Sequence, residues 1–518
     1  MTTHERLPSL TTNAISNAAA LAINCALAFF LTPLITGHIS KANFGVLATA
    51  GSIVGYYGFL DLGVRASISR FIARQSSAKD YEGLNETAST AMFIFTIAAL
   101  VSLAATIVLA SPVGAILARK FALEGADVGN FRLVMLIMGL SVMVTFIGNI
   151  YGSVIIAMER YFILNTIMIG SVLVRVAIVI GVLKSGGGVV GVAAGTLAVA
   201  IISAILWYVF ARRIVPTLSV RFSKANRKAS RQLLTFGSFM MLISLADILR
   251  FRLDTVFIGF WLGMSTVGVY AIAQQIVAYA PQLITAPTTA FMPRFSRLDA
   301  SERGRAEGAR LLMRVQCYSA ALASAIFICA LAVGRNFIVR WLPEDYSAAY
   351  APLVILLGGL VFELAQAPGV HYLKAANKHR FIAVAYIIEG ICKVALATLF
   401  LWLGYGIVAV AVATVIPMAI TRGVVHPIYV SRTIKVSLRA YWRPMAGPFA
   451  VAALFAAFIA WRPLPASVDS WPGIIGGGLA YGAAYLAAVY MLAFPKEERV
   501  WTKQKARTIL GLLPREAE

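Results

Sequence analysis

Fourteen stretches of roughly 20 apolar residues follow one another along this chain, separated by short polar connections. A stretch of that length crosses the hydrocarbon core of a bilayer as an α-helix, which satisfies its own backbone hydrogen bonds. Only 13% of the residues are charged, whereas roughly a quarter are charged in a soluble domain. The sequence therefore predicts an all-α integral membrane protein with about fourteen transmembrane helices. The predicted spans lie at 12–36, 44–74, 87–111, 131–157, 161–183, 188–211, 233–259, 266–292, 309–334, 349–373, 381–403, 405–430, 444–461 and 472–494.

Basic residues are distributed unevenly between the connections. With the N-terminus placed in the cytosol, the inner segments carry about four times as many Lys and Arg residues as the outer ones. Such an excess marks the cytosolic side of a membrane protein, so we expect both termini in the cytosol. The same bias accounts for most of the net charge of +23, and no nucleic-acid partner is needed to explain it.

Two predicted spans carry signs of irregularity. The stretch 44–74 is too long for a straight helix across the bilayer, so we expect it to tilt or to continue into the cytosol. Pro281, Pro287 and Pro293 recur through the eighth span, where each proline removes a backbone donor and bends the helix. The eighth span is therefore a candidate hinge.

The chain contains an internal similarity at a fixed distance. The segment "NFGVLATAGSIVGY" at 43–56 aligns with "TVGVYAIAQQIVAY" at 266–279, and "AMERYFIL" at 157–164 aligns with "ANKHRFIA" at 376–383. Both matches recur six spans apart, so they predict two six-helix lobes related by a parallel repeat around a central cavity. The expected domains are an N-lobe 1–211, a basic cytoplasmic linker 212–232, a C-lobe 233–430, two extra C-terminal helices within 431–494, and an amphipathic cytoplasmic tail 495–518 on the inner membrane surface.

Four ionisable residues interrupt the seventh span, "LISLADILRFRLDTVFIGFWLG" at 242–263. On a continuous helix, Asp247, Arg250 and Asp254 share one face, so the two acids can neutralise Arg250 locally. Arg252 points away from that face. A guanidinium at that depth needs a partner helix, a watery cavity or an anionic ligand.

Other spans contain charges as well. Two acid-first pairs with the i, i+4 spacing, Asp61–Arg65 and Glu389–Lys393, are predicted ion pairs. Arg314 and Arg422 lie near the inner boundary, where long side chains reach water by snorkelling, whereas Arg175 lies too deep for that. Because guanidinium groups bind phosphate oxygens in pairs, we interpret the bases as a lining for an anionic substrate. The candidate substrate-binding residues are Arg65, Arg175, Arg250, Arg252, Arg314 and Lys393.

The buried carboxylates have two interpretations, which the sequence leaves open. They are structural partners of the bases, or they bind a coupling ion, a proton or Na⁺, on one side of the membrane and release it on the other. These acids are Asp61, Asp247, Asp254, Glu363 and Glu389. The four cysteines and five histidines are scattered, without a CxxC or HExxH motif, so we predict no metal site, no catalytic residue and no cofactor.

The segment "FGVLATAGSIVGYYGFLDLGVRASISRFIAR" at 44–74, with Asp61-Leu62-Gly63 and Arg70, and the "ERY" turn after span four resemble the multidrug/oligosaccharidyl-lipid/polysaccharide (MOP) flippase superfamily. The similarity is to its bacterial oligosaccharide flippase branch, of the O-antigen or Wzx type. That resemblance implies a V-shaped bundle in the bacterial cytoplasmic (inner) membrane and alternating access. It also implies a lipid-linked oligosaccharide substrate, the undecaprenyl-diphosphate-linked repeat unit, and contacts with membrane lipids and with the polysaccharide polymerase and chain-length machinery.

Two alternatives stay open. A peptidoglycan-precursor or multidrug exporter would have the same fold, although the basic interior disfavours cationic drugs. A membrane glycosyl polymerase or ligase would use a sizeable outer loop for chemistry, and neither 112–130 nor 335–348 offers an acid/base pair suited to it. The run "GGGVVG" at 186–191 matches a dinucleotide-binding pattern literally, but it lies in a hairpin between two spans and predicts a tight turn.

The charge asymmetry generates a test of topology. Reporter fusions at Asn226, in the basic linker, and at Glu518, at the end of the chain, should both report the cytosol. A periplasmic signal at either position contradicts the predicted orientation.

Overall fold

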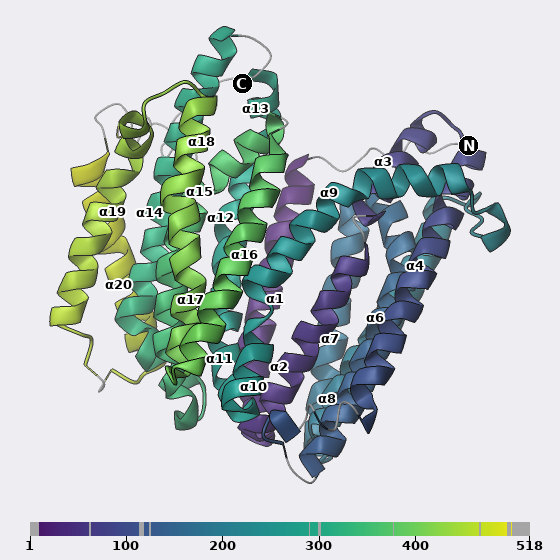
Figure 1. Ribbon diagram of the computed structural model, residues 1–518, viewed down its shortest axis with the longest axis horizontal. Coiled ribbons are helices and arrows are strands. Elements are labelled where there is room, and N and C mark those ends of the chain that lie inside the picture. Colours follow the sequence, from purple (N-terminus) through teal and green to yellow (C-terminus); the bar gives the residue numbers. More distant parts are fainter. Residues whose placement is uncertain are drawn as a thin grey trace. The chain divides into compact units, whose positions relative to one another are not determined.

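The computed structural model describes residues 10–61, 64–112, 116, 119–123, 126–289, 291–298, 302–376, 378–465, 468–494 and 499. Within them every regular element is a helix (Figure 1). The chain forms two compact units: unit 1 comprises Met1–Ala271 with Tyr386–Val410, and unit 2 comprises Ile272–Ala385 with Ala411–Glu518.

Unit 1 contains the N-terminal helices. They are α1 (Leu10–His38), α2 (Lys41–Tyr56), the 3-10 turn η1 (Tyr57–Asp61), α3 (Val64–Ser77), α4 (Tyr81–Ala110), α6 (Ala126–Ala157), α7 (Tyr161–Lys184), α8 (Gly188–Ile214), η2 (Phe222–Lys224), α9 (Arg227–Phe251) and α10 (Asp254–Leu262). Three helices pass from one unit to the other: α11 (Met264–Val277), α16 (His379–Trp402) and α17 (Gly406–Ile420).

Unit 2 contains most of the later helices. They are α12 (Tyr279–Thr289), α13 (Met292–Leu298), α14 (Glu302–Trp341), η3 (Glu344–Ala349), α15 (Tyr350–Ala375), the π-helical turn η4 (Thr421–Val425), α18 (His426–Thr433), α19 (Leu438–Trp461), α20 (Trp471–Ala488) and a second π-helical turn, η5 (Val489–Ala493).

The predicted fold class is confirmed. Eleven described helices are long and apolar enough to cross a membrane. The three remaining predicted spans fall on α1, on the α2–η1–α3 segment and on α9–α10, so each of the fourteen has a helical counterpart. The chain is an all-α integral membrane protein.

The two irregular spans are broken helices. The stretch 44–74 divides at η1 rather than running as one tilted helix, and the proline-rich eighth span divides into α11, α12 and α13. The run "GGGVVG" forms the turn before α8 and its first helical residues, with Gly186 at φ +78° and Gly188 at φ +53°, where a side chain would be strained.

Small residues set the packing within each unit. In unit 1, α6 packs on α4 and α8, and its Gly139 and Gly148 lie directly against Thr106 and Ala204. In unit 2, the long helix α14 packs against α15, α19 and α20. Since apolar side chains gain little by leaving lipid for protein, close van der Waals contact of this kind holds transmembrane helices together.

The compact units do not follow the lobe boundaries expected at 212–232 and 430. Residues 233–271 and 386–410 group with unit 1, because α9, α10 and part of α16 pack there. Compactness and sequence repetition are different criteria, so the lobes stay a prediction. Apart from Arg499, the tail 495–518 lies outside the described residues.

A pair of glycines brings α2 against the start of α11 within unit 1. A Cβ on Gly45 would lie 1.9 Å from the carbonyl oxygen of Met264, and a Cβ on Gly268 would lie 2.5 Å from that of Lys41. Gly45 and Gly268 are equivalent positions in the predicted repeat, and so are Lys41 and Met264. The contact is therefore reciprocal, as expected at an axis that relates two similar segments.

This crossing predicts a position-specific cost. Gly45→Ala should destabilise the protein by about 1–3 kcal/mol, because its methyl group meets backbone that cannot rotate away. Gly51→Ala, on the same helix, is the matched control, since its nearest neighbour is the Met138 side chain at 3.9 Å. Thermal unfolding in detergent measures both. Equal melting temperatures for the two variants would contradict the close crossing.

Candidate functional site

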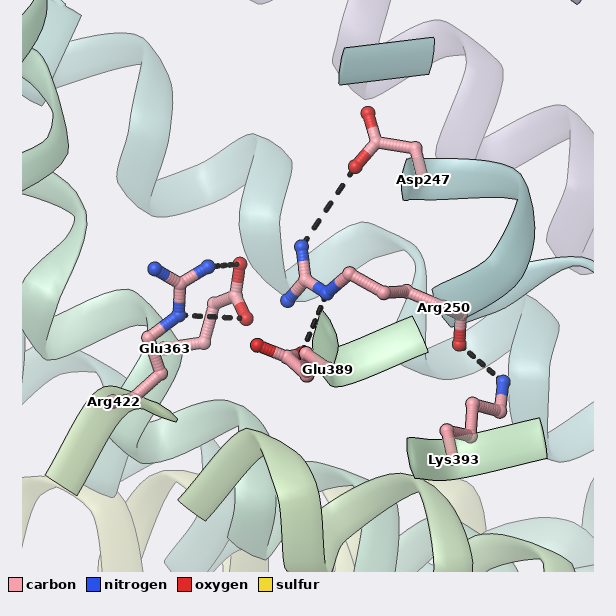
Figure 2. A network of polar contacts seen from close by, with 6 residues as sticks. All are labelled: Asp247, Arg250, Glu363, Glu389, Lys393 and Arg422. Carbon is pink, nitrogen blue, oxygen red and sulfur yellow. Dashed lines mark hydrogen bonds and ion pairs between the residues drawn. The ribbon is translucent and has the colours of Figure 1, made fainter. Parts of the chain in front are cut away.

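Arg250 lies in a buried ion pair between α9 and α16. Its Nε donates to Glu389 Oε1 at 2.6 Å, and both side chains are only 3% exposed (Figure 2). Asp247 approaches Nη1 at 3.7 Å and is 53% exposed, so it is the weaker partner. The carboxylate that balances Arg250 therefore comes mainly from another helix.

Lys393 forms the second buried pair, with Asp254. Its Nζ lies 2.6 Å from Asp254 Oδ1 and also donates to the carbonyl oxygen of Arg250. The Tyr270 hydroxyl donates to Asp254 Oδ2 at 3.0 Å. Both ion pairs thus join the α9–α10 segment to α16, so one face of this segment is held against α16.

These contacts bear on two expectations. The helix ends at Phe251 and restarts at Asp254, so the continuous register expected for Asp247, Arg250 and Asp254 is interrupted, and Asp254 forms its short ion pair with Lys393. Glu389 and Lys393 were expected to pair with each other, and each also forms a short ion pair with a residue of α9–α10. Residues one turn apart on α16 therefore bind successive turns of the broken helix.

Aromatic rings enclose the Arg250 guanidinium. Its carbon lies 4.3 Å from the ring centroid of Tyr386 and 4.5 Å from that of Phe251. Such cation–π contacts stabilise a cation that has left water. Sequence analysis did not single out these rings, although Tyr386 lies three residues before Glu389, on the same face of α16.

Arg252 differs from its neighbour because it lies at the helix break and its side chain is exposed. Its guanidinium lies against α2 at Gly55, where an added Cβ would be 2.1 Å from Nη1. The Tyr56 hydroxyl donates to the Arg252 carbonyl at 2.8 Å, so the backbone is fixed while the cation stays accessible. Only a glycine at 55 leaves room for this placement.

The remaining candidates of unit 1 lie apart from the two pairs. Asp61 accepts from the backbone N–H of Arg65 at 3.1 Å and so caps the start of α3, while the Arg65 side chain is exposed. Arg175 is half-buried in α7, and among the described residues its Nε has no hydrogen-bond partner. A buried guanidinium nitrogen of this kind is costly unless water or a ligand satisfies it.

Unit 2 has its own buried pair, which sequence analysis did not anticipate. Arg422 holds Glu363 in a two-point contact, Nη2–Oε1 at 2.9 Å and Nε–Oε2 at 3.2 Å (Figure 2). The snorkelling interpretation of Arg422 is wrong, since its side chain is 1% exposed. The π-helical turn η4 carries Arg422, and π-turns are frequent at functional positions.

A polar cluster lies beside that pair. The Gln316 amide donates to Gln366 at 3.1 Å and to the Tyr441 hydroxyl at 2.5 Å. His426, one turn after Arg422, is buried, and neither ring nitrogen has a hydrogen-bond partner among the described residues. A Cβ on Gly369 would meet His426, Gln316 and Tyr441, so this glycine brings the cluster together.

The last candidate, Arg314, is part of the lining of a cavity in unit 2. Among the described residues, no group of three or more His, Cys, Asp or Glu side chains could hold a metal ion.

Comparison with known proteins gives a family match and a fold. Residues 10–299 match the model of a family described as polysaccharide biosynthesis protein. An uncharacterized membrane protein, EpsK, of Bacillus subtilis (strain 168) is 24% identical over 513 residues, which are 97% of this chain and 99% of that protein.

Two solved structures share the fold. The lipid II flippase MurJ, in an inward closed conformation, superposes with a TM-score of 0.70 at 13% identity, over 93% of this chain and 99% of that one. An inward-facing multidrug resistance MATE transporter of the MOP superfamily superposes with a TM-score of 0.65 at 16% identity, over 82% and 98%. The expected likeness in fold to a transporter of the MOP superfamily is therefore confirmed.

The Arg250–Glu389 pair predicts a stability effect that a second change reverses. Arg250→Gln should lower the unfolding free energy by about 3–5 kcal/mol, because it leaves Glu389 buried without its cation. Adding Glu389→Gln should restore most of the loss. Melting in detergent measures this, with Asp247→Asn as the control for the exposed acid. Failure of the double variant to recover contradicts the pairing.

Proposed function

Because the chain belongs to the polysaccharide biosynthesis protein family, we propose that it is a flippase for lipid-linked oligosaccharides. It would move undecaprenyl-diphosphate-linked repeat units from the inner to the outer leaflet of the bacterial cytoplasmic membrane for surface polysaccharide synthesis. The family match over residues 10–299 supports this function most directly, and the transporter fold agrees with it. Both support a transporter rather than an enzyme.

We assign first recognition of the diphosphate to Arg252. Its guanidinium is exposed at a break in a transmembrane segment, whereas Arg250 and Lys393 are buried in ion pairs. An accessible guanidinium can hold two phosphate oxygens at once. Arg65, also exposed in unit 1, and Arg175, with its buried Nε, would contribute further positive charge.

The buried acids are candidates for coupling export to an ion gradient by alternating access. Asp254 and Glu389 each have a basic partner, and Glu363 is held by Arg422. A proton or Na⁺ that reaches one of these carboxylates competes with its Lys or Arg partner. Ion binding would therefore loosen α16 from α9–α10, or η4 from α15, which connects the gradient to helix movement.

A peptidoglycan-precursor flippase is the second candidate, favoured by the likeness to MurJ. Both substrates carry a polyprenyl diphosphate, so the phosphate-binding residues do not separate them. Deletion of the gene does. Loss of surface polysaccharide with lipid-linked repeat unit accumulating on the inner leaflet supports the proposal, whereas cell lysis with accumulated peptidoglycan precursor supports the second candidate. If export continues, the polymerase and chain-length proteins are the partners to test by co-purification.

Arg252 gives the sharpest transport prediction. Arg252→Ala should lower export by about tenfold or more, which corresponds to the loss of a charge-assisted hydrogen bond of about 1.5–3 kcal/mol. Arg252→Lys should recover only part, since it keeps the charge and loses the fork. Surface polysaccharide, normalised to folded protein in the membrane, is the measurement. Arg462→Ala, an exposed arginine after α19, is the control.

Gly55 tests the same role without removing the cation. Gly55→Ala should displace the Arg252 guanidinium and lower export, with little effect on melting because only a flexible side chain has to move. In the Arg252→Ala background, Gly55→Ala should add little, since its target is already gone. Full export from a folded Gly55→Ala variant, or independent losses in the double variant, would count against Arg252 as the recognition residue.

A further inference from the structure

A cavity of about 770 Å³ lies within unit 2, at one end of its helices. It is lined by α13, the N-terminal half of α14, the first turns of α19 and the last residues after α20. Its charged lining consists of Arg294, Arg310, Arg314, Arg443 and Glu307. The cavity therefore has an excess of positive charge.

The single acid in the described lining offsets little of that charge. Glu307 lies 3.8 Å from Arg294, and both side chains are more than half exposed, so their attraction is weak. Arg310 and Arg443 have exposed side chains and come from two different helices. An anion in the cavity can therefore be approached by guanidinium groups from two directions.

Apolar residues make up most of the uncharged lining, and part of this lining lies on the protein surface. It includes Leu311, Pro444, Leu492 and Phe494, and the Leu492 side chain is 74% exposed. The Phe494 ring packs edge-on against Tyr318 at 5.2 Å, which fixes it beside the basic lining. A ligand with an anionic head and hydrocarbon chains matches this mixed lining, whereas a free phosphate matches only its arginines.

The walls are held together without a ligand. A Cβ on Gly447 of α19 would lie 2.6 Å from the Cβ of Ala493, so α19 and the end of η5 touch directly. Arg499 donates through Nε to the carbonyl of Phe494 at 2.8 Å and so caps that end. The predicted topology places this end of unit 2 at the cytosolic surface, where anionic headgroups attract basic residues.

We propose that this cavity is a binding site for an anionic glycerophospholipid of the inner leaflet. The arginines would hold its phosphates, and the acyl chains would lie along Leu492 and Phe494. A headgroup with two phosphates, as in cardiolipin, fits best, because Arg310 and Arg443 stand on separate helices. Binding here does not depend on the proposed transport activity.

The test measures lipid binding to the purified full-length protein by native mass spectrometry. Cardiolipin should bind more tightly than phosphatidylcholine, and the R310A/R443A variant should bind cardiolipin at least about tenfold more weakly. The matched control, R340A/R462A, removes two exposed arginines at the opposite ends of the same two helices and should change nothing. Glu307→Gln should strengthen binding severalfold, because it removes the acid from the lining.

Three results overturn the proposal. The first is equal cardiolipin affinity in R310A/R443A and R340A/R462A. The second is phosphatidylcholine binding as tightly as cardiolipin. The third is that R310A/R443A weakens the binding of undecaprenyl diphosphate and not that of cardiolipin, which would make the cavity a substrate subsite. If melting shows that R310A/R443A is unfolded, Glu307→Gln decides, since unchanged cardiolipin affinity then rejects the site.

Discussion

The cost of holding a charge away from water governs how the α9–α10 segment is built. Arg250 and Asp254 would each be unfavourable in an apolar helix, and α16 supplies Glu389 and Lys393 at the spacing that neutralises both. Each segment therefore carries buried charges that are neutralised by side chains of the other. The pairing specifies which face of α16 meets the broken helix, so it determines register as well as compensating charge.

The break between α9 and α10 has a second requirement. Interrupting a helix frees backbone carbonyls, which lipid cannot satisfy. Here Lys393 takes the carbonyl of Arg250, and the Tyr56 hydroxyl takes that of Arg252. Lys393 thus balances the charge of Asp254 and also takes a free carbonyl, and the Arg252 guanidinium at the same break is exposed. The helix break and the exposed Arg252 guanidinium are therefore two results of the same local structure.

Much of the fold was predictable, because apolar runs of membrane length allow little besides helices. The charged residues were predictable as a set, but of their partners the sequence indicated Asp247 for Arg250 and not those on other helices. Spacing on α16 predicted Glu389 with Lys393, whereas the short ion pairs of both run to the α9–α10 segment, which no single-helix pattern indicates. The burial of Arg422 was not predictable for a related reason, since no pattern on its own helix indicates that the Glu363 side chain pairs with it in the interior.

The reciprocal contact of Gly45 with Gly268 bears on how such a chain could arise. Identical subunits related by a twofold axis meet at equivalent positions, so a contact of this kind already exists in a symmetric dimer. Joining two copies of a gene end to end would preserve it without any new interface. Gly45 and Gly268 would then descend from one position of the ancestral subunit. Each has to remain a glycine, because a side chain at either position would meet the backbone of the facing helix.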